Sequence, residues 1–174
     1  MRSAGPEAPL LEAVRASADD LLAYLERRVG REDAEDLLSE TMVVAWRRLV
    51  DLPDDARRAR MWLFGIARTT LLNHARGAAR RRSLVDRLRG PAREAQSAPA
   101  DDGLAVRDAI DRLDPDLGEI VRLVHWERFS LVEVAELLRL PASTVRGRYA
   151  RARDSLVASL AEEPPGIVVA RTRP

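Results

Sequence analysis

Apolar residues recur every three or four positions along most of this chain, with few runs of β-branched residues. That spacing follows the roughly 3.6 residues per turn of an α-helix, so the chain is predicted to be all-α. Residues 9–29 predict one or two helices, and residues 33–49 predict another with Asp33 as its N-cap. The charged residues 51–60 predict a loop, and the next helix is expected from Met61.

A more detailed pattern begins at Phe129. Ser130 and Glu133 have the S-x-x-E spacing of a capping box, and Phe129 with Val134 has the spacing of a hydrophobic staple. A short helix is therefore expected after Ser130, followed by a turn and a second helix that starts near Pro141. Two such helices predict a helix-turn-helix, the motif that places its second helix in the major groove of DNA.

The second helix of this motif has an apolar face and a basic face. Four residues at helical spacing are expected to point inward: Val145, Tyr149, Ala152 and Leu156. Six others are candidates for contact with duplex DNA: Ser143, Thr144, Arg146, Arg148, Arg151 and Arg153. The alternative is an ordinary bundle helix with solvated arginines. A neutral surface helix usually interleaves acids, whereas this one has only Asp154, so DNA binding is favoured.

Two small helical domains are expected, because residues 83–105 have the composition of a flexible linker. The first domain is predicted at residues 8–82 and the second at residues 106–160. Within the second, a helix opened by Asp114 is expected to pack behind the helix-turn-helix. Residues 161–174 form a tail outside the helical pattern.

The composition excludes several classes of protein. There is no cysteine, which excludes disulfides and thiolate metal sites and fits a reducing cytoplasm. The N-terminus lacks the pattern of a signal peptide, and no apolar stretch approaches the length of a membrane span. A cytoplasmic protein without membrane insertion is therefore expected. All 29 basic residues are arginine, whose guanidinium suits phosphates and base edges, although genomic codon bias would give the same enrichment.

The net charge of +1 conceals a strong segregation of charge. Residues 7–55 contain 13 acids and 6 arginines, a net charge of −7, whereas residues 57–93 contain 11 arginines and one acid, a net charge of +10. Residues 94–120 return to −6 and residues 121–160 to +3. Two basic regions separated by an acidic one predict two surfaces that face nucleic acid. The acidic first part is expected to face a basic partner.

The helix expected after Met61 carries five polar residues opposite its apolar positions: Arg68, Thr69, Asn73, Arg76 and Arg80. Such a mixture suits unpaired bases and backbone phosphate. Trp62 is equally compatible with a core position and with a platform for a base, and His74 is more typical of a core or boundary position than of a catalyst. In the preceding helix, an acidic face with Asp36 and Glu40 could dock a basic helix, although the helix dipole alone explains acids in a first turn.

Two stretches of the chain resemble a known family. The first reads D-A-E-D-L-L-S-E-T-M-V-V-A-W and is followed by W-L-F-G-I-A-R-T. It is similar to region 2 of bacterial RNA polymerase sigma factors of the extracytoplasmic-function (ECF) type. The second runs from L-D-P-D-L-G-E-I-V-R through S-L-V-E-V-A-E-L-L-R-L-P-A-S-T-V-R-G-R, and it is similar to region 4 of the same family. The two occur in the family's order and spacing.

The resemblance implies a role for each stretch. The helix with Asp36, Glu40 and Thr41 would dock on the clamp helices of the polymerase β′ subunit. The loop and helix over residues 57–80 would open the promoter and hold the non-template strand of the minus-ten element through Arg57, Arg58, Arg60, Trp62, Arg68, Thr69, Asn73, Arg76 and Arg80. Residues 142–153 would read the minus-thirty-five element as duplex, and region 4 would rest on the β flap. An anti-sigma factor is a common further partner, and no catalytic residue, metal or cofactor is implied.

Several positions depart from the residues usual in this family. Ser39 and Met42 replace a Gln and an aromatic residue beside the docking positions, and Thr69 replaces an Asn that helps to hold a flipped-out base. Arg128 and Arg139 replace glycines on either side of the first helix of the helix-turn-helix. A side chain at positive φ costs about 1 kcal/mol, so strain is expected if Arg139 adopts the turn conformation of glycine.

Three other functions are alternatives to the sigma-factor function that the resemblance implies. A stand-alone helix-turn-helix regulator would use residues 1–90 for sensing or dimerisation, but a dimerising domain does not need the arginine cluster of residues 57–93. A decoy that mimics a sigma factor would bind no DNA, which the arginines of both halves argue against. An enzyme is disfavoured, because His74 and His125 lie in separate segments and no glycine-rich phosphate loop is present.

Overall fold

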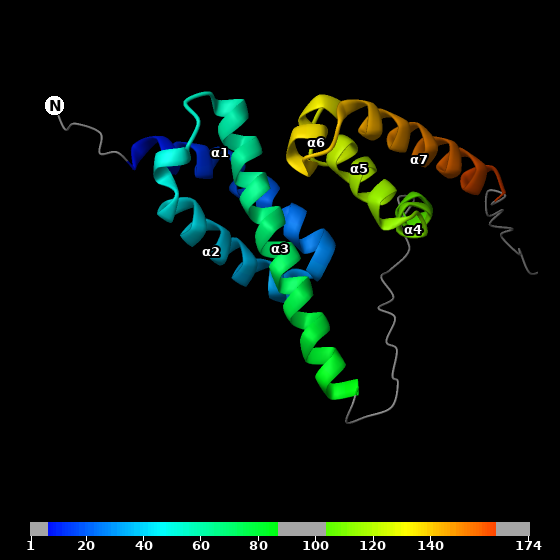
Figure 1. The fold of residues 1–174 in the computed structure, drawn as a ribbon, viewed down its shortest axis with the longest axis horizontal. Helices are drawn as coiled ribbons and strands as arrows, with labels where there is room; N and C mark the ends of the chain where they lie inside the picture. Colours follow the sequence, from blue (N-terminus) through cyan, green and yellow to red (C-terminus); the bar gives the residue numbers. More distant parts are fainter. Residues whose placement is uncertain (1–6, 87–103, 163–174) are drawn as a thin grey trace, which may run out of the picture. The chain divides into compact units, whose positions relative to one another are not determined.

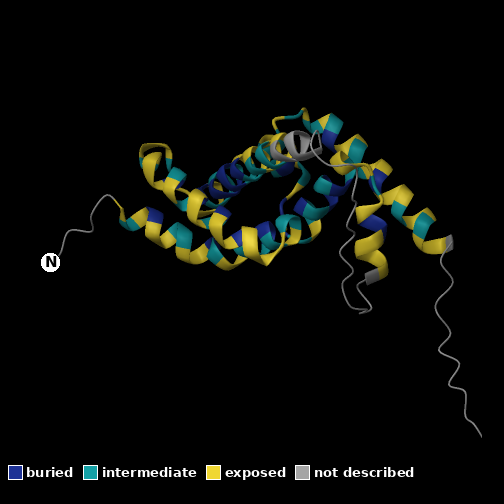
Figure 2. Cartoon of the chain, turned by 90° about the horizontal axis from the view of Figure 1, so that it is seen from below, coloured by how far each residue is buried: buried dark blue, intermediate teal, exposed yellow. Residues whose placement is uncertain are grey.

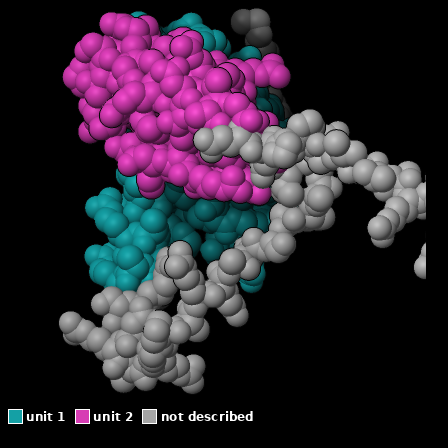
Figure 3. Space-filling model, turned by 90° about the vertical axis from the view of Figure 1, so that its right-hand side faces the viewer, with its two compact units in different colours: residues 1–95 teal, residues 96–174 magenta. Residues whose placement is uncertain are grey.

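The computed structural model describes residues 7–86 and 104–162, and within those ranges every regular element is a helix, as the apolar period predicts (Figure 1). The chain divides into two compact units, residues 1–95 and 96–174 (Figure 3). The first unit contains four elements: α1 (Ala8–Val29), α2 (Arg31–Arg47), the 3₁₀ turn η1 (Leu49–Asp51) and α3 (Ala56–Asp86). The second contains α4 (Leu104–Asp111), α5 (Pro115–His125), α6 (Leu131–Leu138) and α7 (Ala142–Glu162).

Helices α1, α2 and α3 each contact the other two and form a three-helix bundle. Their buried residues recur at helical spacing, so each helix turns one face inward, as the burial colouring shows (Figure 2). The largest fully buried side chains are Tyr24 of α1 and Phe64 of α3, whose rings meet edge to face with centroids 5.3 Å apart. Leu21, Leu25 and Leu63 are also fully buried. An apolar core of this kind holds the three helix faces in place.

The junction between α1 and α2 differs from the sequence prediction. Residues 8–29 form a single helix that ends at Gly30, and the φ of +83° at Gly30 suits glycine better than any residue with a Cβ. α2 then begins at Arg31, so Asp33 lies in the first turn of the helix and is not its N-cap. The Asp33 carboxylate lies 3.9 Å from Nε2 of His74, at the boundary between α2 and α3. Of the core and boundary positions expected for His74, the structure shows the boundary one, with a partly buried side chain.

The start of α3 also differs, because the predicted loop over residues 51–60 is shorter in the structure. The helix begins at Ala56. Asp55 precedes it and accepts a hydrogen bond of 2.9 Å from the backbone N–H of Arg58, which is the geometry of an N-cap. Arg57, Arg58 and Arg60 therefore lie on the helix and not in a loop. α3 continues to Asp86, past the predicted domain end at residue 82, while residues 87–103 of the predicted linker lie outside the described residues.

The second unit is built around α7, which contacts α4, α5 and α6. Asp114 caps α5 by accepting a hydrogen bond from the N–H of Asp116, as the Asp-Pro pair predicts. The core is formed by apolar side chains from all four helices, among them Ile110, Ile120, Leu123, Val134 and Val145. On the rim, His125 Nε2 lies 3.0 Å from the hydroxyl oxygen of Tyr149, which joins α5 to α7. The unit thus packs α7 against α4 and α5, and α6 against α5 and α7.

Both local signals predicted for α6 are confirmed. The Ser130 side chain accepts a hydrogen bond from the Glu133 N–H, and the Glu133 carboxylate accepts one from the Ser130 N–H at 2.8 Å. Phe129 and Val134 are both buried, as a hydrophobic staple requires. Arg139 ends the helix in the left-handed conformation, with φ 55° and ψ 43°. The resemblance places a glycine at this position, so Arg139 adopts the turn conformation for which strain was expected. α7 begins one residue after Pro141 and ends at Glu162, and residues 163–174 lie outside the described residues.

Candidate nucleic-acid interface

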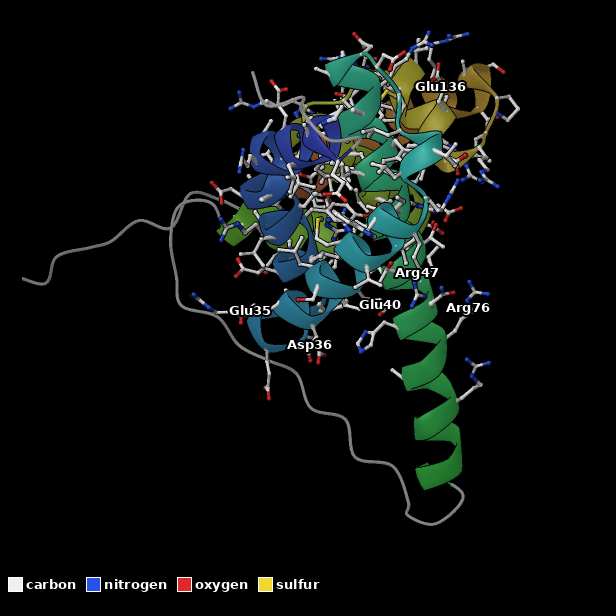
Figure 4. All side chains as sticks on the ribbon, turned by 90° about the vertical axis from the view of Figure 1, so that its left-hand side faces the viewer. Glu35, Asp36, Glu40, Arg47, Arg76 and Glu136 are labelled. Carbon is white, nitrogen blue, oxygen red and sulfur yellow. The ribbon has the colours of Figure 1, made fainter. Side chains whose placement is uncertain are left out.

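The outer face of α2 is acidic. Asp36 and Glu40 are exposed one helical turn apart, and both project from the outer side of the helix (Figure 4). Neither carboxylate has an ion pair or hydrogen bond with any described residue. At about 100° per residue, Val43 and Arg47 continue the same stripe, and Val43 is 49% exposed. This stripe, Asp36-Glu40-Val43-Arg47, offers two unpaired negative charges and an apolar contact to a partner.

Thr41 does not belong to that face, although the sequence analysis placed it there. Its side chain is fully buried, and its Oγ1 donates a hydrogen bond of 2.7 Å to the carbonyl oxygen of Leu37. Position 41 shares the inward stripe of Leu37 and Ala45, which are buried against the rest of the bundle. The structure therefore corrects the prediction that Thr41 contacts a partner. Thr41 supports the packing of α2 instead.

A polar stripe runs along the outer side of α3. Six of the nine residues predicted to contact minus-ten DNA share it at helical spacing: Arg58, Trp62, Thr69, Asn73, Arg76 and Arg80. Apart from Trp62, all of them are exposed, and Figure 4 shows Arg76 pointing outward from the helix. No acid interrupts α3 before Asp86. The stripe therefore combines positive charge with hydrogen-bonding groups over several turns.

Hydrogen bonds within α3 hold the polar groups of this stripe in place. The Thr69 hydroxyl donates to the Gly65 carbonyl oxygen at 2.9 Å, so its oxygen remains available to accept from an external N–H group. Asn73 Oδ1 accepts a hydrogen bond of 2.9 Å from the Arg76 guanidinium, while the side-chain amide N–H₂ of Asn73 points to no described acceptor. These geometries leave both donors and acceptors for a base edge.

The exposure of Trp62 is intermediate between that of a core residue and that of an exposed platform for a base. Its side chain is partly buried, and its Nε1 is buried with no hydrogen-bond partner among the described residues. A buried indole N–H usually finds an acceptor, so this donor is unusual. The ring is neither a fully buried core residue nor a fully exposed platform.

The other three arginines predicted for the minus-ten element lie off the stripe. Arg60 points towards α1, where its guanidinium donates to Asp20 at 2.9 Å and lies 4.6 Å from the centre of the Phe64 ring. Its charge is therefore used within the bundle. At about 100° per residue, Arg57 and Arg68 lie together on one flank of α3, off the stripe. Arg57 is exposed and Arg68 is partly buried.

The burial of the side chains on α7 largely matches the predicted inward and outward faces. Val145 and Ala152 are fully buried, and Tyr149 and Leu156 are partly buried. Arg146 and Arg151 are exposed and have no ion pair within the described part of the chain. They flank a strip of small residues, Ser143, Gly147 and Ala150, and nothing lies within 4 Å of the place where a Cβ on Gly147 would be. A flat strip between two cations allows close approach to a groove.

The remaining candidates on α7 are placed differently. Arg148 is partly buried, and its guanidinium donates to Asp116 of α5 at 2.8 Å. Arg153 pairs with the neighbouring Asp154 at 3.3 Å on the exposed side. Thr144 is partly buried at the edge of the strip. Two of the four arginines are thus engaged within the unit.

Three residues on these faces were not predicted from the sequence. Val43 and the cation Arg47 lie on the same stripe of α2 as Asp36 and Glu40, and Gly65 lies within the polar stripe of α3. The helical period that places Asp36 and Thr69 would also have placed these residues, so the signal was present. Over residues 7–86 and 104–162, no cluster of three or more histidines, aspartates and glutamates could hold a metal ion. No described helix is long and apolar enough to cross a membrane.

Comparison with protein families matches both halves of the chain. The family model described as "Sigma-70 region 2" matches residues 13–81, and the model described as "Sigma-70, region 4" matches residues 103–156. Region 2 thus covers the bundle of α1 to α3, and region 4 covers α4 to α7 as far as residue 156. The fold and its two exposed polar helix faces are those of a DNA-binding transcription protein of the sigma-70 class.

Comparison with individual proteins shows which members of the sigma-70 class the chain is similar to. The chain is 29% identical to the ECF RNA polymerase sigma factor SigL of Mycobacterium tuberculosis over 171 residues, which cover 92% of this chain and 96% of SigL. It is 30% identical to the probable RNA polymerase sigma-C factor of Mycobacterium bovis over 160 residues, which cover 85% of this chain and 82% of that protein. Among solved structures, it is similar to the sigma factor RpoE from Bartonella quintana in complex with the anti-sigma factor NepR. The TM-score there is 0.70 at 22% identity, over 89% of this chain and 98% of that one, which supports the fold.

The chain therefore belongs to the sigma-70 family, and within it to the ECF sigma factors. It is a sigma factor that directs transcription initiation. Sigma factors are DNA-binding regulators and not enzymes. The similarity to sigma factors does not favour the two alternatives, a stand-alone helix-turn-helix regulator or a decoy.

Proposed function

We propose that three helix faces divide the work of this sigma factor. α2 binds core RNA polymerase, α3 holds the non-template strand of the melted minus-ten element, and α7 reads the minus-thirty-five element as duplex. One observation supports this division most strongly. In the first unit, the α2 stripe carries the unpaired carboxylates of Asp36 and Glu40, whereas the neighbouring α3 stripe carries only cations and neutral polar groups. Two surfaces of opposite charge suit two different partners.

The α2 stripe suits a protein partner. Asp36 and Glu40 repel DNA phosphate but attract a basic helix, and the exposed Val43 beside them adds apolar area of the kind that protein interfaces bury. The resemblance to region 2 indicates the clamp helices of the polymerase β′ subunit as that partner. In this proposal region 4 rests on the β flap, through apolar positions that are not assigned.

The α3 stripe suits single-stranded DNA. Unpaired bases expose their Watson–Crick edges, which Thr69 and Asn73 can recognise through the donors and acceptors left available on α3. Arg58, Arg76 and Arg80 lie along the same side and supply charge for the phosphates. Arg60 has no place in this contact, because its guanidinium is bound to Asp20.

The α7 face suits a regular duplex. Arg146 and Arg151 can direct guanidinium forks to base edges or phosphates on either side of the small strip, and Arg–guanine contacts of this kind are common in the major groove. The protein brings no chemistry of its own, because the polymerase forms the phosphodiester bonds, and it acts in the cytoplasm with that enzyme. An anti-sigma factor that covers these faces would silence it, as NepR is bound to RpoE in the similar structure.

The α2 assignment is tested by charge reversal. The double variant Asp36→Arg/Glu40→Arg is expected to weaken binding of the full chain to core polymerase by at least about 10-fold, because two charge pairs of about 1 kcal/mol each become repulsive. Affinity is measured by titrating a fluorescent chain with purified core polymerase. The matched control is Glu12→Arg/Asp19→Arg on α1, which makes the same change of charge at two exposed acids. Equal affinity of the two double variants would refute the assignment.

A further inference from the structure

Two backbone positions in the second unit are unusual. Among the described residues, only Arg128 and Arg139 combine a side chain with positive φ, at 58° and 55°. This left-handed conformation is unfavourable for residues with a Cβ, because the Cβ approaches the following carbonyl oxygen, and glycine adopts it without that penalty. Both positions hold the bulkiest cationic side chain. Strain of this kind is often kept where the side chain has a function.

The side chains of Arg128 and Arg139 make no polar contact with the described residues of the second unit. Both are exposed, and neither has an ion pair or hydrogen bond with any described residue. Other arginines of the same unit behave differently, since Arg122 pairs with Asp111 and Arg148 pairs with Asp116 at 2.8 Å. The packing of the unit therefore gives no reason for an arginine at either strained position.

The two arginines lie at opposite ends of α6. Arg128 is two residues before Ser130, the N-cap of the helix, and Arg139 is its C-cap, three residues before the first residue of α7. In a helix-turn-helix the first helix crosses the DNA backbone while the second lies in the major groove. α6 is that first helix, so a phosphate strand passes near it when α7 is in the groove, and long cationic side chains at its two ends can extend towards that strand.

We propose that Arg128 and Arg139 bind phosphates of the minus-thirty-five duplex, so that the DNA surface extends from α7 to both turns that flank α6. This inference rests on the proposed role of α7. The contacts are to the backbone and carry no sequence information, whereas Arg146 and Arg151 on α7 read the bases. The need for two further cations explains why glycine, the unstrained choice, is absent from both turns.

The test separates strain from charge. Replacing either arginine by glycine relieves the strain, so Arg128→Gly and Arg139→Gly are each expected to raise the melting temperature of the full chain. The same change removes a phosphate contact, so DNA affinity is expected to fall. A purely structural role predicts the first effect without the second. Arg128→Asn and Arg139→Asn serve as second variants, because Asn tolerates positive φ and keeps a side chain.

The probe is a fluorescent duplex selected from a random pool on holoenzyme, reconstituted from the full chain and core polymerase, together with the same duplex with its minus-thirty-five segment scrambled. For each variant, the slope of log affinity against log salt concentration is expected to become shallower by about 1. Affinity for both duplexes is expected to fall by the same factor, since backbone contacts are independent of sequence. Arg107→Gln, an exposed arginine on α4, is the control for loss of one positive charge.

Unchanged affinity and salt slope in the glycine variants, with the melting temperature raised, would overturn the proposal. The variant Arg146→Ala distinguishes this failure from failure of the proposed function. It is expected to reduce the preference for the selected duplex over the scrambled one. If that preference survives, α7 does not read the element, and the proposed function of α7 fails whatever the turn variants do.

Discussion

α3 and α7 carry more arginines than any other helix of their units, and they present different side chains to their partners. The α3 stripe mixes arginines with Thr69, Asn73 and the partly buried ring of Trp62, and hydrogen bonds within the helix hold several of these groups. α7 presents a strip of small residues between Arg146 and Arg151, which have no partner in the described part of the unit.

This difference fits the form of DNA proposed for each helix. A melted strand is irregular, and its recognition requires fixed donors and acceptors that meet splayed bases. A duplex is regular, and a helix enters its major groove most closely where the side chains are small and long cations reach to either side. In the proposed division of work, the same positive charge on two helices therefore serves two kinds of recognition.

On each helix, one arginine binds an acid of another helix in the same unit. Arg60 of α3 binds Asp20 of α1, and Arg148 of α7 binds Asp116 of α5, with N–O distances of 2.9 Å and 2.8 Å. Both guanidiniums are less exposed than their carboxylate partners. The number of arginines on a helix thus overstates its number of DNA contacts.

The largest effect is expected from the double variant Arg146→Ala/Arg151→Ala. Each base contact by arginine is worth about 1–3 kcal/mol, so loss of both is expected to reduce promoter-directed transcription by about 100-fold or more. Run-off transcription with core polymerase measures it, while binding to core polymerase is expected to remain. Arg148→Ala on the same helix is the comparison, and a loss of transcription as large as that of the double variant would remove the distinction drawn between paired and unpaired arginines.

A smaller effect is expected from the double variant Thr69→Val/Asn73→Ala on α3. These changes remove groups that can make two hydrogen bonds to bases, each worth about 1 kcal/mol, so affinity for a promoter with a premelted minus-ten element is expected to fall about 30-fold. Binding to an isolated minus-thirty-five duplex is expected to be unaffected. Holoenzyme binding to the two templates is compared at one salt concentration. Equal losses on both would show that α3 does not discriminate melted from duplex DNA.

The smallest effects are expected at the paired arginines, and they concern stability. Arg60→Ala removes an ion pair and a contact with the Phe64 ring, which together are worth about 1 kcal/mol. Arg148→Ala removes a single exposed ion pair and is expected to cost about 0.5 kcal/mol. Urea unfolding of the full chain measures both. A destabilisation at Arg148 larger than at Arg60 would contradict the contacts described here.

Features that depend on neighbouring residues could be predicted from the sequence. The capping box follows from Ser130 and Glu133, which stand three positions apart. The left-handed turn at Arg139 was expected from the resemblance, because the family has a glycine at that position. The all-α class and the outward faces of α3 and α7 follow from periodicity. The start of α3 was missed because Asp55, its cap, stands in a run of charged residues that resembles a loop.

Features that join distant parts of the chain could not be predicted. The partner of Arg60 is 40 residues away and that of Arg148 is 32 residues away, and no local pattern links them. Thr41 was assigned to a docking surface because it follows Glu40 in the resembling motif. Its burial depends on how α2 packs against the other two helices, which the motif alone does not show.

The most direct test of the division of labour between α3 and α7 is site-specific crosslinking in the holoenzyme. A photo-crosslinking amino acid is placed at Thr69 of α3 or at Ser143 of α7, and promoter DNA is irradiated before and after melting. The expected result is that position 69 crosslinks to the non-template strand only after melting, whereas position 143 crosslinks to the upstream duplex in both states. Crosslinks from position 69 to closed duplex DNA, or none from either position, would contradict the account.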